Sequence, residues 1–136
     1  MSALGLDTSV VVRFLTGEPV ALAQAARKRI GEALQDGHEL VVADVVVVEA
    51  YFVLHKIYGI PKGAAVKALL GLFEQPGFRE EANGVAVAAL RDVAEGQARK
   101  PGMVDRMMHS RYMRECDAML TFEKASRKLG RVEVLG

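Results

Sequence analysis

The sequence contains very little cysteine and almost no net charge. Cys116 is the single cysteine among 136 residues, which excludes an intramolecular disulfide and is typical of a reducing compartment. The 18 Lys and Arg residues nearly balance the 17 Asp and Glu residues, so the formal net charge is only +1. An overwhelmingly basic nucleic-acid coat is therefore excluded, whereas a local basic stripe is not.

The sequence also lacks long apolar stretches and low-complexity segments. Its longest apolar tract, residues 45–54, is interrupted by Glu49 and is too short to cross a bilayer. No positively charged region followed by an apolar stretch stands at the N-terminus, so no secretory signal is expected. A composition of 51% hydrophobic and 26% charged residues excludes an intrinsically disordered chain. We expect one cytoplasmic domain over residues 1–136.

Short apolar runs alternate with longer helix-like stretches, which is typical of a parallel sheet covered on both faces. The expected strands are residues 3–6, 39–43, 78–82, 118–122 and 132–135. The expected helices are residues 21–35, 45–58, 61–74, 85–97, 103–115 and a short one at 123–129. Residues 45–58 are rich in valine but too many for one strand, so we interpret them as a buried helix with Asp44 as N-cap. The predicted fold is α/β with an open, mostly parallel sheet.

Acidic residues fall where ligands usually bind in such a fold, at the carboxyl ends of strands and next to helix N-termini. Asp7 ends the first strand, Glu123 follows the fourth, and Asp105 lies near the start of a helix. Glu49 is the only charge in the apolar stretch 45–54. A carboxylate in such surroundings needs a cation or a proton.

Four acids that gather in one pocket would repel one another. Two carboxylates about 4 Å apart repel by roughly 4 kcal/mol at an effective dielectric constant near 20. No dedicated Lys or Arg stands beside each acid, so we expect a divalent ion, Mg²⁺ or Mn²⁺, held by the carboxylate oxygens. Each acid taken singly also has a structural explanation, as a helix cap or as a first-turn acid.

Three stretches of the sequence resemble the PIN-domain ribonucleases, and most closely the VapC-type toxins of bacterial toxin–antitoxin pairs. In the order of that family they are GLDTSVVVRFLTGEP (5–19), VVADVVVVEAYFVLHKIYGIP (41–61) and MVDRMMHSRYMRECDAMLTFEK (103–124). The resemblance spans essentially the whole chain and implies a three-layer α/β/α sandwich with a mostly parallel central sheet. It also implies a Mg²⁺-dependent endoribonuclease that hydrolyses RNA phosphodiester bonds.

The resemblance gives individual acids their roles. Asp7, Glu49 and Asp105 match the acids that hold the metal. Glu123 stands at the fourth catalytic position, where the family usually has aspartate; it keeps the charge and adds a methylene. Asp117 is an alternative fourth acid, but it precedes its strand and is expected at the opposite end of the sheet.

Supporting and RNA-binding residues are expected around the acids. Ser9 matches a position that supports the metal or its water, and the hydroxyl of Thr121 is a second support. RNA contact requires local positive charge; the candidates are Arg13, Arg106, Arg111 and Lys124. For each of them a solvated helix face is the alternative. The resemblance also implies a homodimer and a VapB-like antitoxin whose tail occupies the groove.

Two alternative functions fit parts of the sequence. A response-regulator receiver needs adjacent acids after the first strand, whereas Asp7 is followed by Thr8 and Ser9. A catalytically silent PIN-like module that only binds RNA or an antitoxin is the other alternative, and the replacement of aspartate by Glu123 favours it.

Overall fold

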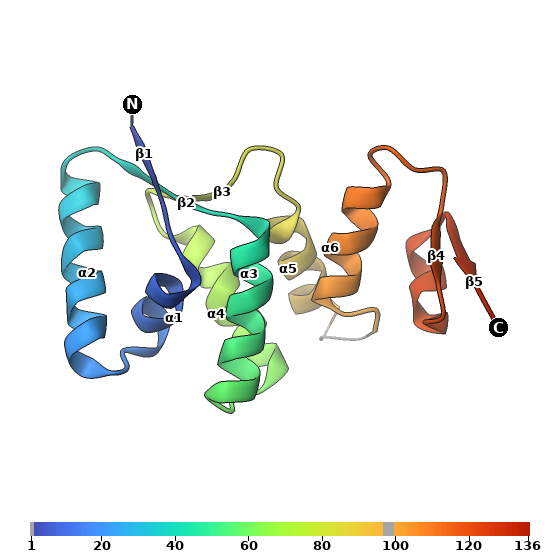
Figure 1. Ribbon diagram of the computed structural model, residues 1–136, viewed down its shortest axis with the longest axis horizontal. Coiled ribbons are helices and arrows are strands. Elements are labelled where there is room, and N and C mark those ends of the chain that lie inside the picture. The colour runs from blue at the N-terminus through green and yellow to red at the C-terminus, as the bar shows by residue number, and fades with distance from the viewer. Residues whose placement is uncertain (1, 97–99) are drawn as a thin grey trace.

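The computed structural model describes residues 2–96 and 100–136 as an α/β fold with short parallel strands (Figure 1). Strands β1 (Ala3–Gly5), β2 (Glu39–Val42) and β3 (Phe78–Glu80) form a parallel sheet in the order β1-β2-β3. Strands β4 (Met119–Thr121) and β5 (Val132–Val134) form a second, parallel sheet. This strand pair lies at the opposite end of the molecule from β1 (Figure 1).

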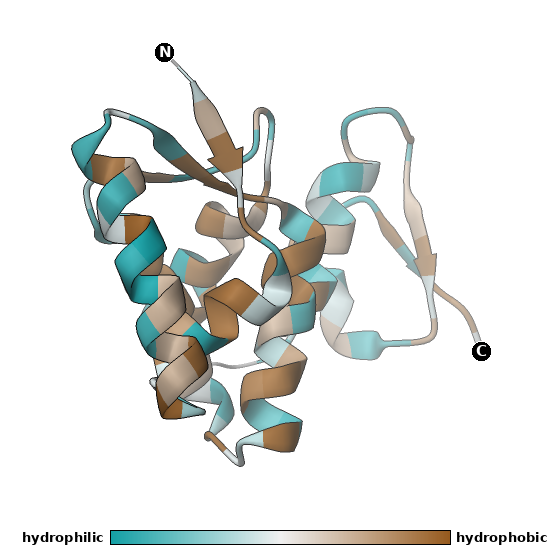
Figure 2. Cartoon of the chain, turned by 60° about the vertical axis from the view of Figure 1, so that its left-hand side comes forward, coloured by the Kyte–Doolittle hydropathy of each residue, from teal (hydrophilic) through white to brown (hydrophobic). Residues whose placement is uncertain are grey.

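The helices connect and cover these strands. Along the chain they are α1 (Thr8–Thr16), α2 (Val20–Gln35), α3 (Asp44–Phe52), the π-helical turn η1 (Val53–Ile57), α4 (Lys62–Glu74), α5 (Ala86–Glu95), α6 (Met103–Tyr112) and the 3₁₀ helix η2 (Lys124–Leu129). Hydrophilic and hydrophobic residues mix along α2, which packs on α1 (Figure 2). In the part of the chain that the structure describes, no helix has the length and apolar character needed to cross a membrane.

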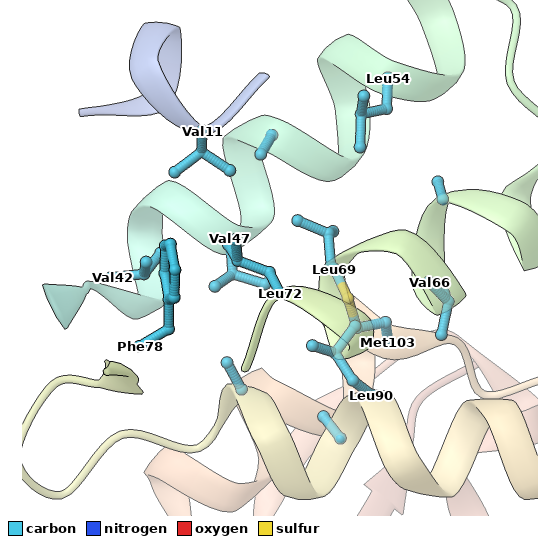
Figure 3. Packing of buried hydrophobic residues seen from close by; sticks show 14 of the residues in the cluster. Val11, Val42, Val47, Leu54, Val66, Leu69, Leu72, Phe78, Leu90 and Met103 are labelled. Atoms are coloured by element: carbon cyan, nitrogen blue, oxygen red, sulfur yellow. The ribbon is translucent and has the colours of Figure 1, made fainter. Parts of the chain in front are cut away.

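The main hydrophobic core lies where four helices meet the three-stranded sheet. Val11 of α1, Val47 of α3, Leu69 of α4 and Leu90 of α5 are completely buried and point into the same packed centre (Figure 3). Each such side chain contributes about 1.5–3 kcal/mol relative to an exposed position. The core therefore fixes α1 and α3 against each other, and these two helices carry the first two predicted site acids.

The two faces of the three-stranded sheet are covered to different extents. On β2, Leu40 and Val42 face the core and are buried. Leu4, which pairs with Leu40 in register, lies on this core face and is half-buried. Ala3 and Gly5, which alternate with Leu4 along β1, are exposed on the other face.

The predicted α/β class is confirmed, but three details of the prediction are wrong. The structure has the helix α1 (Thr8–Thr16), which is not among the helices expected from the apolar pattern. The strands form two parallel sheets in the described residues, rather than one, because β4 pairs with β5 and not with β1. The expected helix 45–58 begins at Asp44, has Ala43 at its N-cap and ends in the π-helical turn η1. The other boundaries differ by a few residues at each end; residue 97, expected to end a helix, lies outside the described residues.

Candidate functional site

Asp7 and Glu49 line the same pocket, which has a volume of about 380 Å³ and lies between the start of α1 and the middle of α3. We call it the α1–α3 pocket. Its remaining lining residues are Thr8, Ser9, Val12, Arg13, Val53, Ile57 and Tyr58. The structure thus brings together two of the four predicted acids, which are 42 positions apart in the sequence.

Asp7 reaches this pocket because the chain turns from β1 directly into α1. Asp7 is the N-cap residue, with extended backbone angles, and its carbonyl oxygen accepts from the amides of Val10 (3.0 Å) and Val11 (3.2 Å). Its side chain makes no capping bond. The carboxylate instead accepts a hydrogen bond from the Ser9 hydroxyl at 3.3 Å. The Asp7 carboxylate is therefore exposed and is not needed to cap α1.

Glu49 is exposed, and its expected burial is wrong. Only one side of α3 packs into the core. Val47 and Ala50 on that side are completely buried, whereas Val45 is 71% exposed. Glu49 lies on the side of α3 that lines the α1–α3 pocket. A carboxylate in contact with water needs no compensating charge to be stable there, so Glu49 is available to a ligand.

Two buried polar atoms of the pocket residues have no partner in the described part of the protein. They are the hydroxyl oxygen Oγ1 of Thr8 and the guanidinium nitrogen Nε of Arg13. A buried polar group left unpaired costs about 1–3 kcal/mol. The pocket therefore combines two exposed carboxylates with one arginine, a set suited to a cation and an anionic phosphate together.

The other two predicted acids lie outside the α1–α3 pocket. Asp105 is half-buried in the first turn of α6. Glu123 is exposed at the end of β4, where its Oε1 accepts from the amide of Ala125 at 3.3 Å and caps η2. Thr121 shapes the same turn, since its hydroxyl oxygen accepts from the Glu123 amide at 3.0 Å. Across residues 2–96 and 100–136, no three His, Cys, Asp or Glu side chains gather into a group that could hold a metal ion.

Of the predicted RNA-binding residues, only Arg13 lines the pocket. Arg106 donates to the carbonyl of Pro101 at 2.8 Å, so its guanidinium holds the turn before α6. Arg111 donates to the carboxylate of Asp44 at 2.6 Å. Lys124 is exposed at the start of η2, on the separate strand pair. Of the four basic residues predicted to surround the acids, Arg13 is therefore the one that lines this pocket.

Asp44, expected at the N-cap of its own helix, has a different role. It is 4% exposed, and its carboxylate accepts from the amides of Val85 (3.0 Å) and Ala86 (3.2 Å) and from Arg111. Asp44 therefore caps the start of α5 and ties α6 to α3. Its partners lie more than 40 positions along the chain, so no local pattern could have identified them.

Comparison with known proteins adds no family to these observations. No protein-family model matches the sequence, and no curated protein matches it.

Proposed function

We propose that the protein is a Mg²⁺-dependent endoribonuclease of the PIN-domain, VapC toxin type, a cytoplasmic enzyme neutralised by a cognate antitoxin. The observation that carries the proposal is that Asp7 and Glu49, two acids matched by the resemblance, line one pocket together with Ser9 and Arg13. The three-layer α/β/α sandwich and the homodimer implied by the same resemblance belong to this proposal.

The donor chemistry of the pocket fits Mg²⁺. This ion is commonly held by one or two carboxylates together with substrate phosphates, and it keeps several waters. Asp7 and Glu49 would hold it, and Ser9, which donates to the Asp7 carboxylate, would fix the orientation of that carboxylate. When bound, Mg²⁺ lowers the pKa of a nucleophilic water and neutralises charge on the phosphate.

The remaining pocket residues would bind and orient the RNA. Arg13 would donate from its guanidinium to a phosphate oxygen. Attack by water breaks the P–O3′ bond; the products are a 5′-phosphate and a 3′-hydroxyl, and the 2′-hydroxyl takes no part. The apolar side chains of Val53 and Ile57 form the wall on the α3–η1 side.

A catalytically silent module that binds RNA or an antitoxin is the second candidate function. It is favoured by the position of Asp105 and Glu123 outside the α1–α3 pocket. Such a module would use Arg13 and the apolar wall of the pocket for binding, without cleavage.

A cleavage assay on total RNA with Mg²⁺ or Mn²⁺, repeated with a chelator, separates the two functions. We expect wild-type cleavage that stops on chelation, and a loss of about 100-fold or more in Asp7→Asn because a ligand of the essential ion is lost. Asp36→Asn, at the exposed end of α2, is the matched control and should cleave like wild type. RNA binding without cleavage would establish the silent module, and 2′,3′-cyclic phosphate ends would exclude hydrolysis by water.

Growth of a host that expresses this chain alone tests the toxin assignment. We expect arrest with wild type and relief with Asp7→Asn, whereas normal growth with abundant soluble wild-type protein would overturn toxicity.

A further inference from the structure

A second hollow adjoins the α1–α3 pocket along the exposed side of α3. Its volume is about 440 Å³, and it shares Glu49, Val53 and Ile57 with that pocket. We call it the α3 hollow. Its other lining residues are Val45, Val48, Phe52 and Lys56. A group bound in the α3 hollow therefore lies directly beside a ligand of Asp7 and Glu49.

The course of the helix explains why the shared residues lie on one side. Residues four apart, such as Glu49 and Val53, are neighbours on a helix surface. α3 then continues into η1 (Figure 1), where the amide of Tyr58 donates to the carbonyl of Val53, five residues back, at 3.2 Å. This wider turn keeps Ile57 in line with Val53 and Glu49. Turns of the π type within helices frequently occur at functional sites.

The α3 hollow is mostly apolar, and its large side chains are exposed. Phe52 and Ile57 are 41% and 76% exposed, and Val45 is exposed as well. A group of exposed apolar side chains with polar residues at its rim marks an interaction site. The aromatic side chain that lines this hollow belongs to Phe52. An exposed aromatic ring can stack on a nucleobase, and such stacking accepts every base because each base has a π-face.

Lys56 adds a positive charge to the α3 hollow. Its side chain is exposed, and its Nζ lies 6.0 Å from the centroid of the Phe52 ring. Among the residues that the structure describes, Lys56 forms no salt bridge. The flexible stem of a lysine lets its ammonium turn from the ring to an anion. Since one sugar carries both a base and a phosphate, a phosphate bound by Lys56 brings its base to the Phe52 ring.

The distance between Glu49 and Lys56 suits neighbouring groups of one nucleic-acid strand. The two residues are seven positions apart, which corresponds to roughly 10 Å along the helix axis. Val53 lies between them and lines both the pocket and the hollow. A strand with one phosphate in the α1–α3 pocket therefore reaches Lys56 with a neighbouring phosphate, after crossing apolar side chains.

We propose that the α3 hollow binds an unpaired nucleotide next to the cleaved phosphate, with its base stacked on Phe52 and its phosphate on Lys56. The proposal rests on the nuclease function, which puts the cleaved phosphate beside Asp7 and Glu49. A base within a duplex is already paired and stacked, so it has no face to offer to Phe52. Phe52 is therefore a specificity-determining residue that selects single-stranded RNA without selecting one base.

Fluorescence anisotropy with an end-labelled single-stranded RNA hexamer tests the base contact apart from cleavage. A chelator keeps the RNA intact, and a hexamer with the same backbone but no bases is the matched ligand. We expect Phe52→Leu to weaken binding of the complete hexamer about tenfold, the effect of one base stacked on an aromatic ring. Its binding of the abasic hexamer should not change. Phe52→Trp should bind like wild type, and so should Leu22→Ala, at an exposed leucine of α2.

The phosphate contact of Lys56 is tested by salt dependence. Lys56→Gln should weaken binding of the complete and the abasic hexamer by the same factor, because a phosphate contact carries no information about the base. The slope of log K against log salt concentration should become shallower by about 0.7, the value for one phosphate contact with a single strand. Lys28→Gln, on the exposed surface of α2, should leave both the affinity and the slope unchanged.

Three results would overturn the base site. Equal affinity of wild type for the two hexamers would show that no base is bound. Unchanged binding of the complete hexamer in Phe52→Leu would show that the α3 hollow serves another partner. A change from dimer to monomer in Phe52→Lys, measured by light scattering, would assign the hollow to a second copy of this chain.

Cleavage, measured separately with Mg²⁺, distinguishes this inference from the proposed function. If both hold, Phe52→Leu should raise the KM for single-stranded RNA about tenfold and leave kcat near the wild-type value, because Phe52 contacts no reacting group. Binding that depends on Phe52 and on the bases, without any cleavage, would overturn the nuclease function and retain Phe52 as a base-binding residue. Cleavage with equal affinity for the two hexamers would overturn the base site alone.

Discussion

Two acids on the same helix, five residues apart, illustrate how differently one chemical group is used in this protein. At the start of α3, Asp44 is 4% exposed and its carboxylate is fully engaged by two amides and a guanidinium. In the middle of α3, Glu49 is exposed and lines a pocket with Asp7. Saturation by protein donors marks Asp44 as a structural acid, whereas Glu49 has its carboxylate available for a ligand.

Two arginines, Arg111 and Arg13, differ in the same way as the two acids. Arg111 has its guanidinium on Asp44, while Arg13 has a buried Nε without a partner in the described residues and lines the α1–α3 pocket. Arg111 is therefore a structural residue at one end of α3, whereas Arg13 lines a pocket with two acids at the other.

Removal of the Asp44 carboxylate should have the largest effect on stability. Asp44→Ala leaves the amides of Val85 and Ala86 unpaired at the start of α5 and deprives Arg111 of its partner. We expect the free energy of unfolding to fall by about 3 kcal/mol, measured by urea denaturation. Glu49→Ala is the matched control and should change it by no more than about 0.5 kcal/mol. Equal losses of unfolding free energy in Asp44→Ala and Glu49→Ala would contradict the distinction between a structural acid and an acid available to a ligand.

Substitution of Glu49 should affect metal binding and leave folding unchanged. We expect Glu49→Gln to weaken Mn²⁺ binding about tenfold or more by calorimetric titration, because one of two carboxylate ligands is lost. The unfolding free energy should stay within about 0.5 kcal/mol of wild type. Glu32→Gln, on the exposed surface of α2, should bind Mn²⁺ like wild type. Unchanged binding in Glu49→Gln would remove the α1–α3 pocket as a metal site.

Substitution of Arg111 should mainly affect stability, whereas substitution of Arg13 should mainly affect RNA binding. Arg111→Ala should lower the free energy of unfolding by about 1 kcal/mol, since its side chain is partly exposed and the Asp44 pair is screened by solvent. Its effect on RNA affinity should be small. Arg13→Ala should weaken RNA binding in a filter or anisotropy assay, with little change in stability. Weaker RNA binding in Arg111→Ala together with lower stability in Arg13→Ala would contradict a structural role for Arg111 and a binding role for Arg13.

The sequence predicts the parts of this fold that depend on local pattern. Helix and strand alternation follows from apolar spacing, and Asp7 was placed at the end of β1 from a few neighbouring residues. Burial of Glu49 was wrong because four consecutive valines suggest an apolar helix on all sides, whereas Val45 faces solvent. The role of Asp44 depends on Val85 and Arg111, which only tertiary packing brings to it.

The distribution of strands between two sheets also escaped prediction. The three residues of β4 do not indicate whether the strand pairs with β1 or only with β5. That choice depends on bonds from His109 and Arg131, which hold the strand pair against α6. A strand's residues set its faces, but its neighbour is set by contacts elsewhere in the chain.

The smallest expected effect concerns Tyr51, a third titratable group on α3 beyond Asp44 and Glu49. Burial raises the pKa of the Tyr51 phenol above its ordinary value of 10.0. The folded state therefore holds the phenolic proton more tightly than the unfolded chain does. The resulting stabilisation is fully present below pH 10 and is lost as the pH rises through the pKa of the folded state. Tyr51→Phe should remove this component from the pH dependence of urea denaturation between pH 9 and 11. An identical alkaline loss of stability in wild type and Tyr51→Phe would show that burial does not raise the pKa of Tyr51.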